Sequence, residues 1–197
     1  MISLLAQLII LFAVIFDPLA SFAVFFTATR SMGLHERQRT ATYALLVAGG
    51  LSLAVLLLGD RLLGLFSTTL DEFRVAGGIV LGILGVKMAL GLNLNNIEHA
   101  KNKSGRAIAA IIGTPLLTGP AAITAIIVSV QDNGRMITGI ALLAVLAVTA
   151  IIFYQAEKVN KLFGKDLIQI LSTILGLVTI AWGVKFVMTG IVNILFG

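Results

Sequence analysis

The sequence predicts an all-α integral membrane protein with six transmembrane helices. Three observations support this prediction: 58% of the 197 residues are hydrophobic, only 12% are charged, and the mean hydropathy is +1.06. Soluble domains are about 45–50% apolar and about 25% charged, so the composition argues against a soluble enzyme and against a disordered chain. The chain has no cysteine, which excludes a disulfide framework and thiol chemistry.

Six apolar runs account for most of the chain. Each is long enough for a transmembrane helix, which needs about 20 apolar residues to cross about 30 Å of hydrocarbon. The first run carries one charge, Asp17, the third carries Lys87 and the sixth carries Lys185, whereas the other three carry none. The runs do not alternate polar and apolar residues over about 10 positions, as barrel strands do. In order, they are residues 1–29, 40–59, 75–97, 107–131, 136–156 and 167–197.

The basic residues predict how the helices are oriented. Nine lysines and arginines lie in the connections after the first, third and fifth runs, but only three lie in those after the second and fourth. Because cytoplasmic loops carry the excess of such residues, we expect a multi-pass plasma-membrane protein whose odd-numbered connections are cytoplasmic and whose termini are both outside. The net charge of +5 then needs no nucleic-acid partner. The nine are Arg30, Arg37, Arg39, Lys101, Lys103, Arg106, Lys158, Lys161 and Lys165, and the three are Arg61, Arg74 and Arg135.

The chain also repeats itself. A shift of 97 places Pro18 on Pro115, and a shift of 98 places Lys87 on Lys185. Because each half holds three helices, the second half must enter from the opposite side of the membrane. Such inverted-topology repeats are typical of secondary transporters, and some channels also have them. We therefore expect a single transmembrane domain over residues 1–197, with one repeat over about 1–97 and the other over about 98–197.

The first and fourth helices are predicted to be broken near the midplane of the membrane. The three prolines of the chain, Pro18, Pro115 and Pro120, all lie in these helices. Proline removes a backbone N–H and pushes the residue before it out of helical geometry. Unwound backbone at this depth must line a cavity or be buried in protein, and matching interruptions in two repeats mark a transporter's binding site. The alternative is a helix that is kinked at proline but continuous.

The residues around the prolines form the candidate substrate site. The half-helix N-termini offer N–H groups and a positive dipole end to a carboxylate, while Asp17 and the preceding carbonyls suit an ammonium group or a proton. Asp17 is the only acid within a predicted span, so it is the candidate for proton coupling, and it can also serve as an N-cap. The predicted site residues are Asp17, Pro18, Leu19, Ala20, Ser21, Thr114, Pro115, Leu116, Leu117, Thr118, Gly119, Pro120 and Ala121.

Other chemistry is not indicated by the sequence. No HExxH, P-loop or GxSxG pattern appears, and no second buried acid is present for a dyad. We therefore expect no enzyme activity, no catalytic residue, no metal and no organic cofactor. Lys87 and Lys185 are interpreted as lysines that reach the membrane interface, with a pairing or gating role as the alternative. Glycines spaced by seven residues in the third and sixth helices are expected to allow close helix packing.

Two segments give the chain a resemblance to a known family: Asp17-Pro18 followed by Phe22 and Phe25, and the run from Pro115 to Ile123. Over essentially its whole length the sequence resembles the MarC family of bacterial and archaeal membrane proteins, and within it the small neutral amino acid transporter (SnatA) branch. The resemblance implies a six-helix symporter of small neutral amino acids such as glycine and alanine. It also implies a proton as the coupling ion, with sodium as the alternative, and leaves the oligomeric state unknown.

Three other functions compete with symport. An exporter of amino acids or other small metabolites would share the fold, because direction depends on gradients and gating. A channel for a small solute would give no accumulation driven by a gradient. A membrane scaffold without transport would bind no small ligand.

Overall fold

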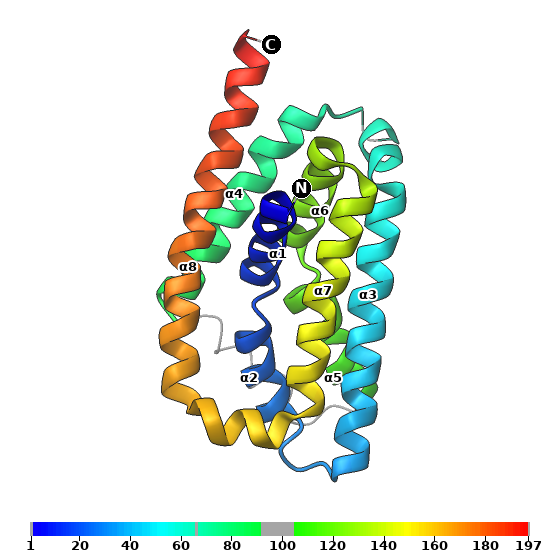
Figure 1. The fold of residues 1–197 in the computed structure, drawn as a ribbon, viewed down its shortest axis with the longest axis vertical. Coiled ribbons are helices and arrows are strands. Elements are labelled where there is room, and N and C mark those ends of the chain that lie inside the picture. Colours follow the sequence, from blue (N-terminus) through cyan, green and yellow to red (C-terminus); the bar gives the residue numbers. More distant parts are fainter. Residues whose placement is uncertain (1, 66, 92–104, 197) are drawn as a thin grey trace.

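The computed structural model describes residues 2–65, 67–91 and 105–196, and these form helices without any strand (Figure 1). Helices α1–α2, α4 and α7 run downward in Figure 1, and α3, α5–α6 and α8 run upward, so both termini lie at the upper end. The elements are α1 Ile2–Phe16, α2 Pro18–Ala28, α3 Leu34–Leu65, α4 Leu70–Ala89, α5 Gly105–Ile111, the π-helix η2 Ile112–Leu117, α6 Pro120–Asn133, α7 Arg135–Tyr154 and α8 Ala156–Phe196.

Four segments of the described chain are long and apolar enough to cross a membrane, fewer than the six that were predicted. The third predicted run falls short because α4 carries four charged residues and ends at Ala89, and residues 92–97 lie outside the described residues. The fourth falls short because it is divided into α5, η2 and α6. The four are Ser3–Ala28, Leu34–Gly59, Arg135–Tyr154 and Leu167–Phe196.

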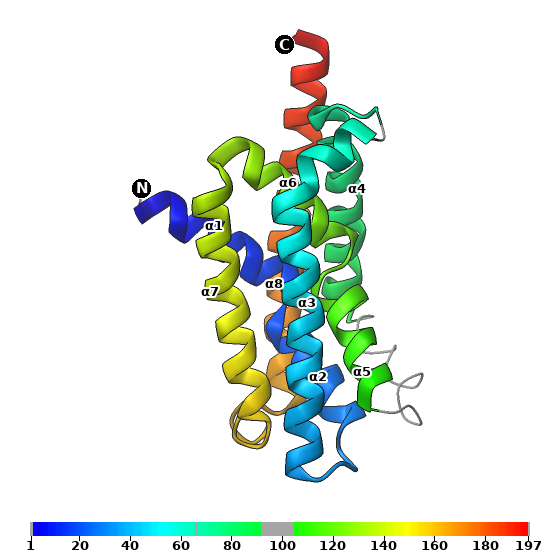
Figure 2. The same ribbon diagram turned by 90° about the vertical axis from the view of Figure 1, so that its right-hand side faces the viewer.

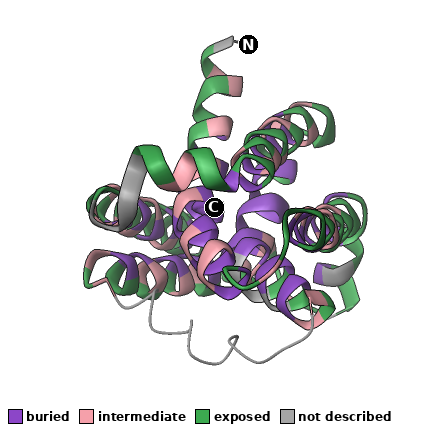
Figure 3. Ribbon diagram, turned by 90° about the horizontal axis from the view of Figure 1, so that it is seen from below, coloured by how far each residue is buried: buried purple, intermediate pink, exposed green. Residues whose placement is uncertain are grey.

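The interrupted helices occupy the interior of the bundle. Most of Ser3–Ala28 is buried by other helices, whereas the other three apolar segments leave most of their surface exposed. Nearly every residue of α6 from Ala121 to Val130 is also buried. Helix α7 packs beside α1–α2 and lies between them and α3 in Figure 1, as seen from another side in Figure 2, and Figure 3 shows the buried ribbon gathered at the centre. Exposed aliphatic side chains on α3, α7 and α8 suit contact with lipid.

Helices α4 and α8 pack antiparallel through glycines. A Cβ atom added at Gly78 would lie 2.6 Å from the carbonyl oxygen of Gly183, and one at Gly85 would lie 2.6 Å from that of Gly176. The two backbones are therefore in direct contact, as the glycine spacing predicted. At its upper end in Figure 1, α4 begins with a capping box, in which the backbone N–H of Thr69 donates to the Glu72 carboxylate at 2.8 Å. This bond and that from the Thr69 hydroxyl lower the pKa of Glu72.

Candidate functional site

The first helix is interrupted at Asp17, as predicted. Asp17 has φ 36° and ψ 70°, a left-handed conformation that separates α1 from α2. Aspartate tolerates this conformation better than most residues because its short side chain can hydrogen-bond locally. Pro18 occupies the first position of α2, where its missing N–H breaks no helical hydrogen bond. The Asp-Pro pair therefore ends one helix and starts the next within a single residue.

The Asp17 carboxylate is buried and accepts hydrogen bonds at both oxygens. Its Oδ1 accepts from the backbone N–H of Ala20 at 3.2 Å, which makes it the N-cap of α2. Its Oδ2 accepts from the hydroxyl of Ser172 on α8 at 3.0 Å. No cation of the described residues lies within ion-pair distance of Asp17. A carboxylate inside a membrane protein without a cation is costly, so a proton or an ammonium group bound there would be stabilised.

Ser21 completes the first break. Its hydroxyl donates to the carbonyl of Phe16 at 3.2 Å, and its backbone N–H donates to the carbonyl of Asp17 at 3.0 Å. Ser21 therefore satisfies a backbone carbonyl at the end of α1. Pro18 and Ala20 are buried and Leu19 is half-buried.

The fourth helix is also interrupted at a proline, as predicted, but the interruption lies at Pro120 and not at Pro115, which the shift of 97 places on Pro18. Pro115 lies inside the π-helix Ile112–Leu117, and the helical path ends only at Thr118 and Gly119. A π-helical turn bonds residues five apart, which lets a proline pass without ending the helix. Pro120 then starts α6 at its first position. The helix starts at Pro18 and Pro120 are thus 102 residues apart, not 97, because 120 − 18 = 102.

The second break lacks a side-chain cap. Gly119 has extended backbone, with φ −76° and ψ −179°, and within the described parts of the chain α6 has no side-chain cap. The predicted site residue Thr114 is exposed. The buried Thr118 instead donates its hydroxyl to the carbonyl of Ala48 on α3 at 3.3 Å, which holds the break against α3. Leu117 is buried, and the side chains of Pro115 and Leu116 lie outside the described residues.

A pocket of about 170 Å³ lies at the second break. Three of the predicted site residues line it, namely Gly119, Pro120 and Ala121. It also contains Ile15, two residues before Asp17, and Lys87 from α4. Residues 17–21 do not line this pocket, although α1 and α2 contact η2 and α1 contacts α6. The structure therefore brings the two breaks into neighbouring positions but not into one described cavity.

Sequence reasoning missed two further features of this region. Ser172 gave no signal, because a single serine in an apolar helix is unremarkable until its partner is known. Ser52 lies one turn from Ala48 on α3, is fully buried, and is a hydroxyl without a hydrogen-bond partner among the described residues. Lys87 was singled out but was not assigned to the site.

Each end of the bundle is tied by a buried arginine. At the upper end Arg74 of α4 pairs with Asp132, near the end of α6. At the lower end Arg37 of α3 donates to the carbonyl of Thr29 at the end of α2, at 3.3 Å, and pairs with Glu157 of α8 at 3.2 Å. The half-helices that begin at the two breaks are therefore fixed at opposite ends.

Comparison with known proteins identifies the family. The model of the MarC family of integral membrane proteins matches residues 2–195. The chain belongs to the MarC family. The chain is 31% identical to a UPF0056 membrane protein of Methanocaldococcus jannaschii, covering 90% of each chain. It is 30% identical to the UPF0056 membrane protein YhcE of Escherichia coli, covering 95% of this chain and 91% of YhcE.

The MarC match confirms the resemblance seen in the sequence. It makes this chain a membrane-located, multi-pass protein, in agreement with its apolar helices. The names of these relatives describe membrane proteins and state no substrate or reaction. No solved structure matches the chain.

Proposed function

We propose that this MarC protein is a secondary transporter of small neutral amino acids such as glycine and alanine, coupled to protons in symport. The observation that carries the proposal is the interruption of the central helix at a buried carboxylate, Asp17, beside a second interrupted helix. Interrupted helices inside a membrane bundle supply helix ends for the binding of ions and small charged groups. A protein that served only as a scaffold could cap α2 with a neutral side chain, so a buried carboxylate without a cation favours transport.

The substrate carboxylate is assigned to the N-terminus of α6. The first amides of that helix carry a positive dipole end and receive no side-chain cap, and the pocket beside them also contains Lys87. A carboxylate in this pocket would thus meet amide N–H groups and a positive charge together. The pocket of about 170 Å³ suits a ligand of few atoms, because sites for drug-sized ligands span about 300–1,000 Å³.

Asp17 is assigned the coupling proton, with sodium as the alternative ion. Its two oxygens already accept bonds from Ala20 and Ser172, and it lacks a cation among the described residues. Protonation would remove the buried charge and change the hydrogen bond between Asp17 and Ser172. Because Ser172 belongs to α8, this change would favour movement of α8. An ammonium group of the substrate is the other cation that this carboxylate can bind.

The proposed transport cycle uses two inverted repeats, residues 1–97 and 98–197, within one transmembrane domain. The contacts of α4 with α8 support this relation: Gly78 meets Gly183, and Gly85 meets Gly176, at equal distances. A shift of 98 carries Gly78 onto Gly176 and Gly85 onto Gly183. Each glycine pair therefore maps onto the other, as a twofold axis between α4 and α8 requires. Breaking the Arg74–Asp132 ion pair at one end and the interactions of Arg37 at the other, in turn, would expose the site alternately to the two sides. The basic connections are placed in the cytoplasm and both termini outside, in the plasma membrane.

Exchange of labelled glycine tests whether the protein transports amino acids at all. Proteoliposomes preloaded with unlabelled glycine are placed in labelled glycine without any ion gradient, and uptake of label is measured. We expect transient uptake above equilibrium that unlabelled alanine inhibits. A channel would show no such overshoot, and a scaffold would take up no label beyond that of empty liposomes. If the protein exports amino acids, its transport in cells would require the opposite gradient.

Filling the second break is expected to abolish this exchange. In Gly119→Leu the new side chain enters the pocket beside Pro120, so we expect exchange to fall at least tenfold while the protein still folds. Gly50→Leu is the matched control, because a Cβ at that exposed position of α3 meets no atom within 4 Å. Exchange by Gly119→Leu at the rate of the control would show that the substrate does not use this pocket.

A further inference from the structure

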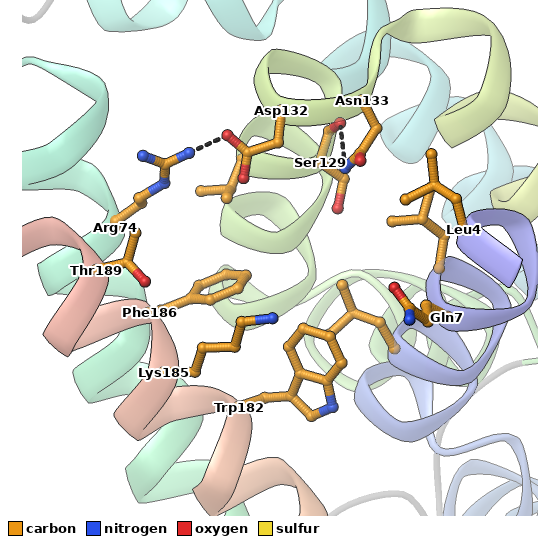
Figure 4. A pocket seen from close by; sticks show the side chains of 13 residues that line it. Leu4, Gln7, Arg74, Ser129, Asp132, Asn133, Trp182, Lys185, Phe186 and Thr189 are labelled. Carbon is orange, nitrogen blue, oxygen red and sulfur yellow. Dashed lines mark hydrogen bonds and ion pairs between the residues drawn. The ribbon is translucent and has the colours of Figure 1, made fainter. Parts of the chain in front are cut away.

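A separate pocket of about 200 Å³ lies near the end of the bundle that holds both termini (Figure 4). It is formed by side chains of α1, α4, α6 and α8, and it is distinct from the pocket at the second break. Its charged groups come from Arg74, Asp132 and Lys185, and Trp182 forms part of its wall. Its uncharged polar lining residues are Gln7, Ser129, Asn133 and Thr189. None of these residues belongs to the predicted site.

The basic side of this pocket is Lys185. Its side chain extends from α8 into the pocket, and its amine lies 4.6 Å from the centre of the Trp182 ring (Figure 4). No carboxylate of the described residues lies within ion-pair distance of this amine. A lysine within an apolar helix is costly unless it meets water, a partner or a ligand. The amine is therefore a cation directed at a cavity, with an aromatic face as its neighbour.

The acidic side of the pocket is formed around Arg74. This guanidinium pairs with Asp132 and, at 2.8 Å, with Asp71, so one positive charge faces two carboxylates. The side chain of Asp132 keeps 45% of its surface exposed, which leaves room for another hydrogen-bond donor. The arrangement has an excess of one negative charge on this side and the positive charge of Lys185 on the other.

We propose that this pocket is an outer subsite that binds the zwitterion of a small amino acid before it reaches the helix breaks. The substrate carboxylate binds the amine of Lys185, and the substrate ammonium binds the carboxylate of Asp132. The walls contributed by Leu8, Leu11 and Phe186 accept a hydrogen or a methyl side chain. This inference rests on the proposed function, since it takes the same substrate class. It also gives the Arg74–Asp132 pair a direct link to the ligand.

Trp182 is the one tryptophan of the chain and forms part of the wall of this pocket, so its fluorescence is expected to change when a ligand binds there. The purified protein is titrated with glycine and with alanine, and separately with acetate and with methylammonium. We expect a saturable change with the amino acids and at least tenfold weaker binding of either half-ligand. Acetate that titrates as well as glycine would overturn the zwitterion site.

Substitutions at Lys185 and Asp132 test the subsite, and a substitution at Lys161 controls for effects of removing a lysine from α8. Lys185→Gln should weaken glycine binding at least tenfold, Lys185→Arg should retain most of it, and Lys161→Gln, at the other end of α8, should leave it unchanged. Asp132→Asn should weaken glycine binding but not acetate binding. The proposal would be overturned if Lys185→Gln bound glycine as tightly as the wild type does. Loss of glycine binding in Lys161→Gln would also overturn it.

The outcomes also separate this inference from the proposed function. Gly119→Leu is expected to lose exchange but to keep the Trp182 titration, because the two pockets share no residue. Glycine exchange with a flat titration would overturn the subsite and leave the transporter. A full titration without any exchange would keep the subsite as a binding site and overturn transport.

Discussion

Asp17→Asn is expected to abolish proton-driven accumulation while the protein still folds. Asparagine keeps a side-chain oxygen that can accept from the Ala20 amide, and it tolerates the left-handed conformation found at this position. The fold should therefore lose little stability. The variant cannot exchange a proton at this site, so the ratio of internal to external glycine should fall to one under a proton gradient.

The control for this experiment is Glu72→Gln. Glu72 is an exposed acid in the first turn of α4, and glutamine can also complete the capping box. We expect this variant to accumulate glycine as the wild type does, with unfolding and yield measured for both. Accumulation by Asp17→Asn at every pH tested would remove Asp17 from the coupling step. Exchange without accumulation in that variant would support its assigned role.

Gly78→Ala and Gly82→Ala should change stability in opposite directions, although both replace glycine in α4. At Gly78 a Cβ atom would lie 2.6 Å from the backbone oxygen of Gly183, so α4 and α8 must separate. Overpacking of this kind costs about 1–3 kcal/mol. At Gly82 a Cβ meets no atom within 4 Å, so replacing glycine within a helix should stabilise it by about 0.5–1 kcal/mol.

Unfolding of both variants in mixed detergent would measure these changes. We expect Gly78→Ala to unfold at lower denaturant than the wild type, and Gly78→Ala with Gly85→Ala to lose most of the folded yield. Equal stability of Gly78→Ala and Gly82→Ala would contradict the close contact between α4 and α8. Because the two glycine pairs are related by the proposed repeat, Gly85→Ala alone should cost about as much as Gly78→Ala.

The sequence predicted those features that depend on local chemistry. Composition indicated a membrane protein, and the Asp17-Pro18 pair correctly placed the first break, because an N-cap and a proline at the first helical position act within one turn. The glycine spacing correctly indicated close packing, since only glycine permits backbone contact.

Features that depend on distant contacts were not predictable in the same way. Pro115 lies within a π-helix, and no local signal in the sequence distinguishes this from a break. Ser172 is 155 positions from Asp17 along the chain, so its hydrogen bond follows from the packing of α8. The charges of α4 also reduced its apolar span, and two of them, Arg74 and Asp71, pair with each other, while Arg74 also pairs with Asp132.

The most direct test of the account is glycine accumulation in proteoliposomes with and without an inward proton gradient. The account predicts accumulation above equilibrium only with the gradient, and its loss when the gradient is dissipated. Equilibration without accumulation would contradict proton coupling, and accumulation with a sodium gradient instead would assign the coupling to sodium. Absence of glycine and alanine uptake by protein shown to be folded would contradict the proposed substrate class.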